Sequence, residues 1–231
     1  MHKTIDPAPG SARPSAPPVR RGLLAAKAAA CARCQACPLY RNATQSVFGE
    51  GRAGAAVMLV GEQPGDAEDL AGRPFVGPAG ALLDAAIRDA GLQRRDVYVT
   101  NAVKHFNFEQ RGKHRLHKKP GAGDVRACRP WLLDEITIVR PQVIVALGAT
   151  AAASLFGPRV KLTRDRGHAL PAEVTPIDGA GRSAVHLVTF HPAAVLRAPT
   201  SERRAELREL LTGDLALAGR LAGKSRGPSP S

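Results

Sequence analysis

The chain of 231 residues has few acidic residues, few aromatic residues and no long apolar run. Its longest apolar stretch, residues 143–156, is too short to span a bilayer and is interrupted by Gly, Thr and Ser. An N-terminal segment that superficially resembles a signal peptide is interrupted by Lys27 and preceded by a polar, Pro-rich stretch. We therefore expect a soluble, cytoplasmic protein without a membrane partner, and we expect a monomer. In that compartment, four cysteines suggest metal or redox chemistry before disulfides.

The shortage of acidic residues leaves a large basic excess. There are 33 Lys and Arg against 20 Asp and Glu, which gives a net charge of +13 and an isoelectric point of about 10.5. A domain this basic is typical of nucleic-acid-binding proteins. Basic residues also lie within the predicted folded part, so a nucleic-acid partner is favoured over a merely basic tail. A protein bound to DNA in this way would be associated with the nucleoid.

The pattern of apolar segments predicts one folded domain over residues 21–222, between tails at 1–20 and 223–231 that should be disordered. Apolar runs predict strands at 55–61, 97–103, 142–148 and 184–192. Helices are expected at 21–36, 80–92, 124–139, 149–157 and 201–223, and the segment before residue 124 should be a basic loop. Strands that alternate with helices predict an α/β fold, a three-layer α/β/α sandwich around a four-stranded, mostly parallel sheet.

Unusual polar residues follow three of the predicted strands. Glu62 and Gln63 follow the first strand, Asn101 the second and His191 the fourth. Ligands of parallel sheets bind beyond the carboxyl ends of the strands, so the sequence predicts a binding site there. Asn101 suits the edge of a pyrimidine, although an Asn turn cap is the alternative. Phe75 lies in an otherwise polar loop, where it either stacks on a base or anchors the loop in the core.

The stretch GKHRLHKKP, residues 112–120, contains four Lys or Arg, two histidines and no acidic residue. One interpretation is a solvated loop that contacts phosphate. The other is that one histidine performs chemistry on a nucleic acid held by the surrounding cations.

The cysteines form a second constellation. Cys31, Cys34 and Cys37 make two overlapping C-x-x-C pairs, and Cys128 follows much later. Such pairs bind zinc or iron–sulfur clusters or act as redox pairs, and inert thiols in a helix are the alternative. The fourth ligand of a metal site would be the remaining cysteine or a histidine.

Taken together, the motifs C-x-x-C-P-L, GEQPG, GRPFVGPAG, TNAVK, CRPWL and HP resemble, in this order, the iron–sulfur uracil-DNA glycosylases of family 4. The similarity runs from about residue 31 to 220. Within that family the chain is similar to the UdgX branch, which becomes covalently linked to the DNA that it processes. That branch has GEQPG and a basic insertion ending in Lys-Arg-Arg-Ile-His. Here the insertion is GKHRLH, so His114 and Leu116 depart from the pattern.

The resemblance implies a [4Fe–4S] cluster and its ligands. His105 occupies the position where the family has its third cysteine, so the implied ligands are Cys34, Cys37, His105 and Cys128. The Cys34–Cys37 pair is favoured because Pro and Leu follow Cys37, which leaves Cys31 without an assigned role. A structural role for the cluster is expected before a redox role.

The resemblance also implies base-excision DNA repair on uracil-containing DNA, single-stranded or with the uridine flipped out. The enzyme would cleave the N-glycosidic bond of deoxyuridine, and His117 would then bond to C1′ of the abasic site, assisted by Glu62. Uracil would be bound by Gln63, Asp66, Phe75, Asn101 and His191, and His191 would stabilise charge on the departing base. DNA contacts would come from Lys113, His114, Arg115 and Lys118. The alternatives are a conventional family 4 glycosylase that uses water, a non-catalytic iron–sulfur DNA-binding protein and a zinc-containing interaction module.

Overall fold

The computed structural model describes residues 18–157, 159–170 and 184–224. Its strands are β1 (Val57–Gly61), β2 (Val97–Asn101), β3 (Phe108–Arg111), β4 (His114–His117), β5 (Val143–Leu147) and β6 (Val185–Thr189). Its helices are α1 (Pro18–Cys31), α2 (Asp66–Ala71), α3 (Pro78–Asp89), α4 (Ala122–Val139), α5 (Ala149–Phe156), α6 (Leu162–Asp165), α7 (Pro192–Leu196) and α8 (Ser201–Lys224). Two short 3₁₀ turns cover Pro38–Arg41 and Arg94–Asp96.

The central sheet has four strands in the order β2-β1-β5-β6, and all neighbouring pairs are parallel. Leu59 of β1 is in register with Val99 of β2 and Val145 of β5. The three strands are buried along their whole length, which explains their continuous apolar sequences, since a parallel sheet is covered on both faces.

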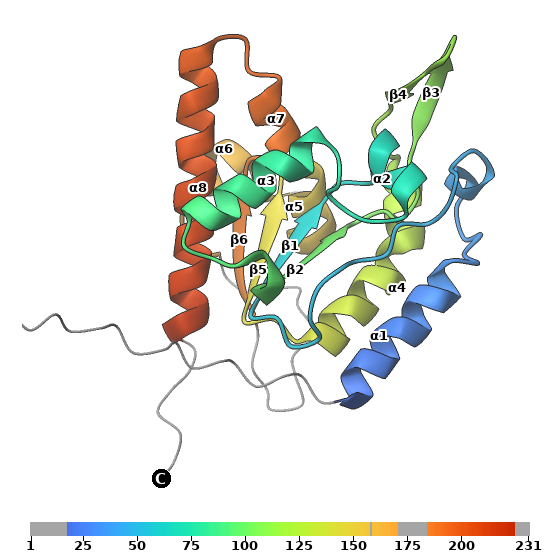
Figure 1. Ribbon diagram of the computed structural model, residues 1–231, viewed down its shortest axis with the longest axis horizontal. Coiled ribbons are helices and arrows are strands. Elements are labelled where there is room, and N and C mark those ends of the chain that lie inside the picture. The colour runs from blue at the N-terminus through green and yellow to red at the C-terminus, as the bar shows by residue number, and fades with distance from the viewer. Residues whose placement is uncertain (1–17, 158, 171–183, 225–231) are drawn as a thin grey trace, which may run out of the picture.

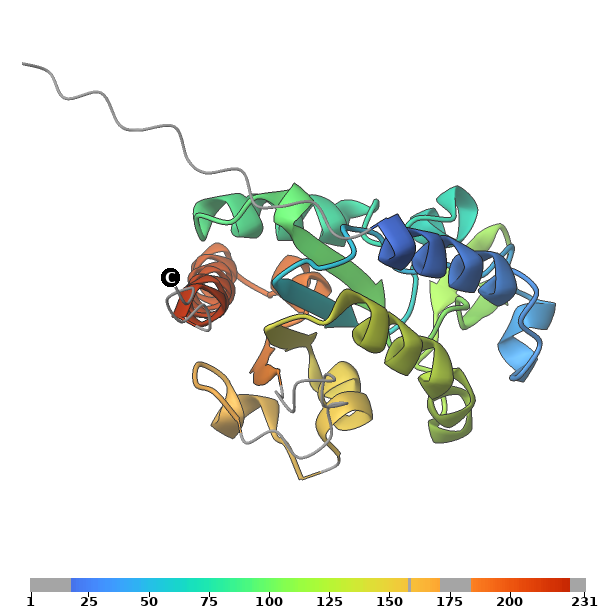
Figure 2. The ribbon, with the colours of Figure 1, turned by 90° about the horizontal axis from the view of Figure 1, so that it is seen from below.

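Alternate side chains of the strands pack into two separate cores. Leu59 and Val145 face α3 and α8, whereas Met58 and Ile144 face α4 and α5. Figures 1 and 2 show these helix pairs on opposite sides of the sheet, with α1 packed on the outside of α4. The predicted three-layer α/β/α sandwich with a four-stranded parallel sheet is confirmed. None of the described helices has the length and apolar content needed to cross a membrane.

Two predicted boundaries differ from the structure. The tails expected at 1–20 and 223–231 lie outside the described residues except at their inner ends, where 18–20 begin α1 and 223–224 end α8. The helix expected to reach residue 36 ends at Cys31, where the Cys34 N–H bonds to the Cys31 carbonyl in a turn. Pro38 disfavours helical geometry at Cys37, so the second C-x-x-C pair lies in irregular chain.

The segment expected to be a basic loop contains a β-hairpin instead. β3 and β4 pair antiparallel, with Phe108 opposite His117, and the hairpin projects from the body of the molecule beside α2 (Figure 1). Its two-residue turn places Gly112 at φ 56°, which glycine adopts without strain. The hairpin has polar residues on both faces, so it lacks the apolar alternation by which a strand is recognised in sequence.

Candidate active site

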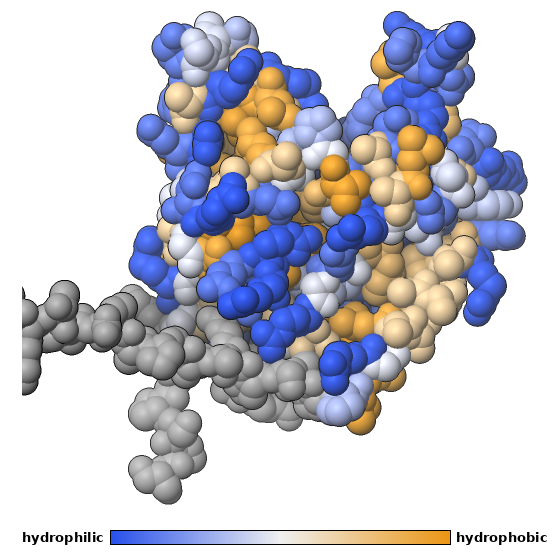
Figure 3. Space-filling view, viewed as in Figure 1, coloured by the Kyte–Doolittle hydropathy of each residue, from blue (hydrophilic) through white to orange (hydrophobic). Residues whose placement is uncertain are grey.

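The carboxyl edge of the sheet contains a cavity. The connection after β1 leads to β2 on one side of the sheet, whereas the connection after β5 leads to β6 on the other side. The two connections therefore diverge between the neighbouring strands β1 and β5, which opens a crevice at this edge. The cavity has a volume of about 370 Å³. Figure 3 shows this edge notched between the α7–α8 end and the hairpin. The polar and aromatic side chains lining it are Glu62, Gln63, Glu68, Phe75, Asn101, His117, Lys119, Thr150, His191 and Arg197.

Phe75 and Asn101 lie together at Gly61, the last residue of β1. A Cβ atom on Gly61 would overlap both Asn101 Oδ1 and the Phe75 ring, so the glycine leaves room for these two side chains. Phe75 has φ 57°, which is uncommon for a residue with a side chain, and the residue is 8% exposed. An aromatic face beside a buried amide is an arrangement suited to a flat, polar-edged ring such as a pyrimidine.

His191 lies at the N-cap of α7. Its Nδ1 accepts the N–H of Ala193 at 3.1 Å, which puts the proton of the neutral imidazole on Nε2. Burial, with smaller contributions from Arg197 and His117, lowers the pKa of His191 to about 4. The Phe75 and His191 ring centroids are 6.2 Å apart. His191 is therefore a neutral N–H donor beside the aromatic ring at neutral pH.

Glu62 and His117 meet at the side of the cavity formed by the hairpin. His117 Nε2 is 3.5 Å from Glu62 Oε1, and the His117 side chain is 50% exposed. The histidine thus retains access to a ligand, and a carboxylate lies next to it that can orient the ring or accept its proton.

Gln63 is buried and joins the loop after β1 to the base of the hairpin. Its Nε2 donates to the carbonyls of Asn107 and Lys118 at 3.1 and 3.0 Å, and its Oε1 accepts the Asn107 N–H at 3.2 Å. The side chain expected to bind uracil is therefore committed to holding the residues on either side of the hairpin, next to His117.

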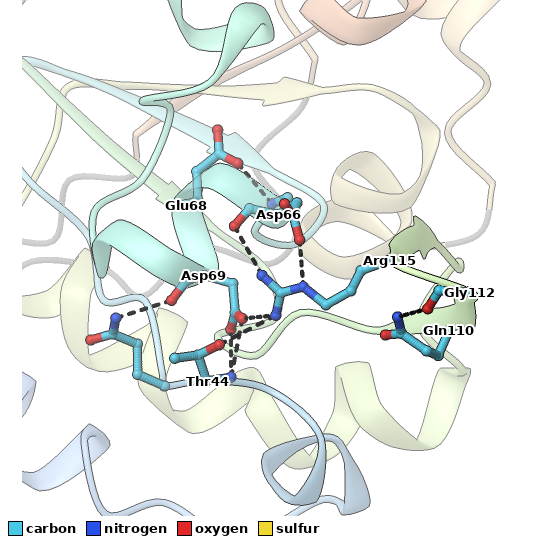
Figure 4. Close-up of polar contacts among 9 residues, drawn as sticks. Thr44, Asp66, Glu68, Asp69, Gln110, Gly112 and Arg115 are labelled. Carbon is cyan, nitrogen blue, oxygen red and sulfur yellow. Dashed lines mark hydrogen bonds and ion pairs between the residues drawn. The ribbon is translucent and has the colours of Figure 1, made fainter.

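Asp66 and Arg115 also differ from the expectation. Asp66 is not among the cavity-lining residues, and its carboxylate pairs with Arg115, as Figure 4 shows. Arg115 also bonds to Asp69 at 2.6 Å and lies over the rings of Phe106 and Phe108. The Arg115 side chain is only 17% exposed. These contacts fasten the hairpin to α2, whereas Lys113, His114 and Lys118 remain exposed.

Glu68, Lys119 and Arg197 line the cavity but were not identified from the sequence. Lys119 lies within the basic stretch of residues 112–120, and Arg197 lies six residues after His191. Glu68 follows Gly65 at the spacing of a helix capping box, which was the available signal. Its two carboxylate oxygens accept the N–H groups of Gly65 and Gly77, both at 3.0 Å, so it joins the GEQPG segment to the loop that carries Phe75.

We expect Glu68→Ala to lower the free energy of unfolding by about 3 kcal/mol. The variant loses two hydrogen bonds to a buried carboxylate, and the backbone N–H groups of Gly65 and Gly77 are left without their acceptor. Urea unfolding measures this. Glu209→Ala removes an exposed carboxylate of α8 and should change stability by less than about 0.5 kcal/mol. Equal losses in the two variants would contradict the assignment.

The cysteines and His105 are the residues expected to hold a cluster, and they come from the end of α1 and the chain after it, the segment after β2, and α4. All four cysteines are free thiols. Cys34 Sγ accepts the indole N–H of Trp131 and Cys128 Sγ accepts the backbone N–H of Lys104, both at 3.1 Å. N–H groups directed at sulfur are a feature of iron–sulfur ligands.

His105 is buried, and its Nδ1 has no hydrogen-bond partner among the residues that the structure describes. Burial lowers the pKa of His105, so the ring is neutral and has an available lone pair. No group of three or more His, Cys, Asp or Glu among the described residues is arranged to hold a single metal ion. A cluster is ligated through several iron atoms, so its donors need not converge on one point. The unpartnered nitrogen and the N–H···S contacts fit such a group.

Comparison with known proteins shows which family this chain belongs to. Residues 48–213 match the model of the uracil DNA glycosylase superfamily. The chain is similar to a type-4 uracil-DNA glycosylase of Thermotoga maritima, with 41% identity over 79% of this chain and 86% of that protein. It is also similar to type-4 uracil-DNA glycosylases of Pyrobaculum aerophilum and Archaeoglobus fulgidus. The identities are 40% over 72% of this chain and 81% of the former, and 34% over 84% of this chain and 90% of the latter.

Proposed function

Because this chain belongs to the uracil-DNA glycosylase superfamily, we propose that it excises uracil from DNA and remains bonded to the abasic site through His117. The observation that carries the covalent step is the position of His117. It lies half-exposed beside Glu62, at the rim of a cavity that has Phe75 and Asn101 at its base.

The base is recognised in the cavity. A uridine flipped out of the stack, or already in single-stranded DNA, places uracil against the Phe75 ring, and the Asn101 amide hydrogen-bonds the polar edge of the base. The backbone after β1, near Gln63, adds polar contacts. Asp66 acts outside the cavity, through Arg115, as a positioning residue for the hairpin.

Bond cleavage places negative charge on the departing base. The C1′–N1 bond breaks and its electron pair leaves with uracil, which delocalises the charge onto O2. The neutral His191 ring is a hydrogen-bond donor for that oxygen, supported by its fixed tautomer and lowered pKa.

His117 then captures the electron-poor C1′. A lone pair of the neutral imidazole forms the new N–C1′ bond, and the resulting imidazolium releases its N–H proton, for which Glu62 is the adjacent acceptor. A nucleophile held beside the carbon is favoured over water by proximity. The product is a stable histidine–deoxyribose bond, so each molecule acts once.

The hairpin holds the DNA backbone. Lys113, His114 and Lys118 are exposed and available to phosphates, while Arg115 fixes the hairpin on α2.

A [4Fe–4S] cluster would be held by Cys34, Cys37, His105 and Cys128. When bound it supplies a structural link between three chain segments. The unpartnered His105 Nδ1 and the N–H donors to Cys34 and Cys128 support this set.

The proposal is tested with a labelled oligonucleotide containing one uracil, incubated with the protein and run on a denaturing gel. A shifted band that survives heat and detergent, in an amount stoichiometric with the protein, is the expected result. Free abasic DNA produced over many turnovers would instead establish a conventional glycosylase. Binding without uracil release would leave only a DNA-binding protein.

A further inference from the structure

Lys104 is a buried, charged residue that has no role in the reaction proposed above. Its side chain is 0% exposed, as is that of Glu135, with which it forms an ion pair at 2.6 Å. A buried charge is costly unless it is paired and fully hydrogen-bonded. The ammonium meets this condition because it also donates to Thr100 Oγ1 at 2.6 Å and to the Asn101 carbonyl at 2.8 Å.

The backbone of the same residue contacts the cysteine cluster. The Lys104 N–H donates to Cys128 Sγ at 3.1 Å, and the next residue is His105, with its unpartnered Nδ1. The Lys104 carbonyl accepts the Val47 N–H at 2.7 Å. One residue thus contacts a cysteine of α4 through its main chain and the end of β2 through its side chain.

Asn101 is held at this end of β2 from both sides. β2 is an edge strand, and its neighbour β1 supports Asn101 on one side only. On the other side, the Asn101 carbonyl bonds to the Lys104 ammonium. Glu135 completes this support because its carboxylate also accepts from Tyr98, Thr100 and the Gly49 N–H. The Asn101 amide itself is buried against Gly61 and Phe75 at the cavity.

We propose that Lys104 is a positioning residue that fixes the Asn101 amide for uracil recognition and ties it to the Cys128 arm of the cluster site. The side chain does the first task and the backbone the second. A change confined to the side chain therefore separates them. This inference rests on the proposed function, since it assumes that Asn101 reads the base.

The variants Lys104→Met and Lys104→Met/Glu135→Gln test it. The double variant removes both buried charges and leaves no unpaired charge in the interior. It therefore tests the role of Lys104 even if the single variant does not fold. Lys27→Met is the matched control, because Lys27 also pairs with an acidic residue of α4, Asp134 at 2.7 Å, but lies on α1.

Binding is measured with an oligonucleotide that carries 2′-fluoro-2′-deoxyuridine, which resists cleavage, and with the same oligonucleotide carrying thymidine. The readout is the dissociation constant for the thymidine oligonucleotide divided by that for the uracil analogue. This measurement requires no catalysis. We expect the ratio to fall about 10- to 100-fold in the Lys104 variants, as hydrogen bonds to the base are lost, and to stay unchanged in Lys27→Met. Iron per chain and visible absorption should stay unchanged in all of them, because the Lys104 N–H to Cys128 remains.

An unchanged ratio in the folded Lys104 variants would overturn the inference. So would a ratio that falls only together with loss of iron, since Lys104 would then act through the cluster site alone. A wild-type protein that shows no preference for the uracil analogue would instead refute base recognition itself, and with it the proposed function.

Discussion

His117→Ala is expected to abolish the heat-stable protein–DNA band, to below about one part in 10³ of the wild-type amount, while uracil release continues. The adduct requires a nitrogen next to C1′, and a nearby water has no comparable advantage of proximity. Removal of the imidazole leaves space beside Glu62 for a water molecule, so free abasic DNA should appear as the product. A denaturing gel with the uracil oligonucleotide, combined with alkaline cleavage of abasic sites, measures both species.

His114→Ala is the matched control for this prediction. His114 lies in the same strand, β4, but is exposed near the hairpin turn and does not line the cavity. The variant should form the adduct in full amount and lose at most a few-fold in DNA affinity, as for one phosphate contact. An adduct that persists in His117→Ala, or one that disappears in His114→Ala, would reject His117 as the nucleophile.

The second large effect is expected from removal of a residue proposed to ligate the [4Fe–4S] cluster. We expect His105→Ala and Cys128→Ser to lose the iron and the brown colour, because each removes a donor that is buried in the protein. The end of α1, the segment after β2 and α4 would lose their common attachment. A loss of about 4 kcal/mol would lower the melting temperature by about 10 °C or more in a domain of this size.

Two variants give this prediction its controls. His105→Cys supplies a thiolate at the same position and should retain the iron, since thiolates are the usual cluster ligands. Cys31→Ser changes a fully buried thiol that bonds to Ser46, and it should also retain the iron. Iron analysis and visible spectroscopy decide the outcome. Full iron content in His105→Ala, or its loss in Cys31→Ser, would require a different ligand set.

The fold and the location of the site followed from local sequence patterns. Runs such as VMLVG and VIVAL are typical of strands buried on both faces, and the helices predicted between them indicated a parallel sheet. The carboxyl ends of those strands therefore had to meet at one edge. The sequence alone therefore predicted that Glu62, Asn101 and His191 lie at that edge, and all three line the cavity.

The division of tasks among the polar residues was decided only by the tertiary structure. Arg115 pairs with Asp66 across 49 positions of sequence, and Gln63 bonds to Lys118 across 55. An arginine in a basic stretch has the same local pattern whether it faces a phosphate or a carboxylate of another segment. The same holds for Lys104, which follows a strand as any surface lysine could, yet pairs with Glu135 in the interior. Hydrogen-bond partners of this kind depend on which segments the folded core brings together, and no periodicity in the sequence records that.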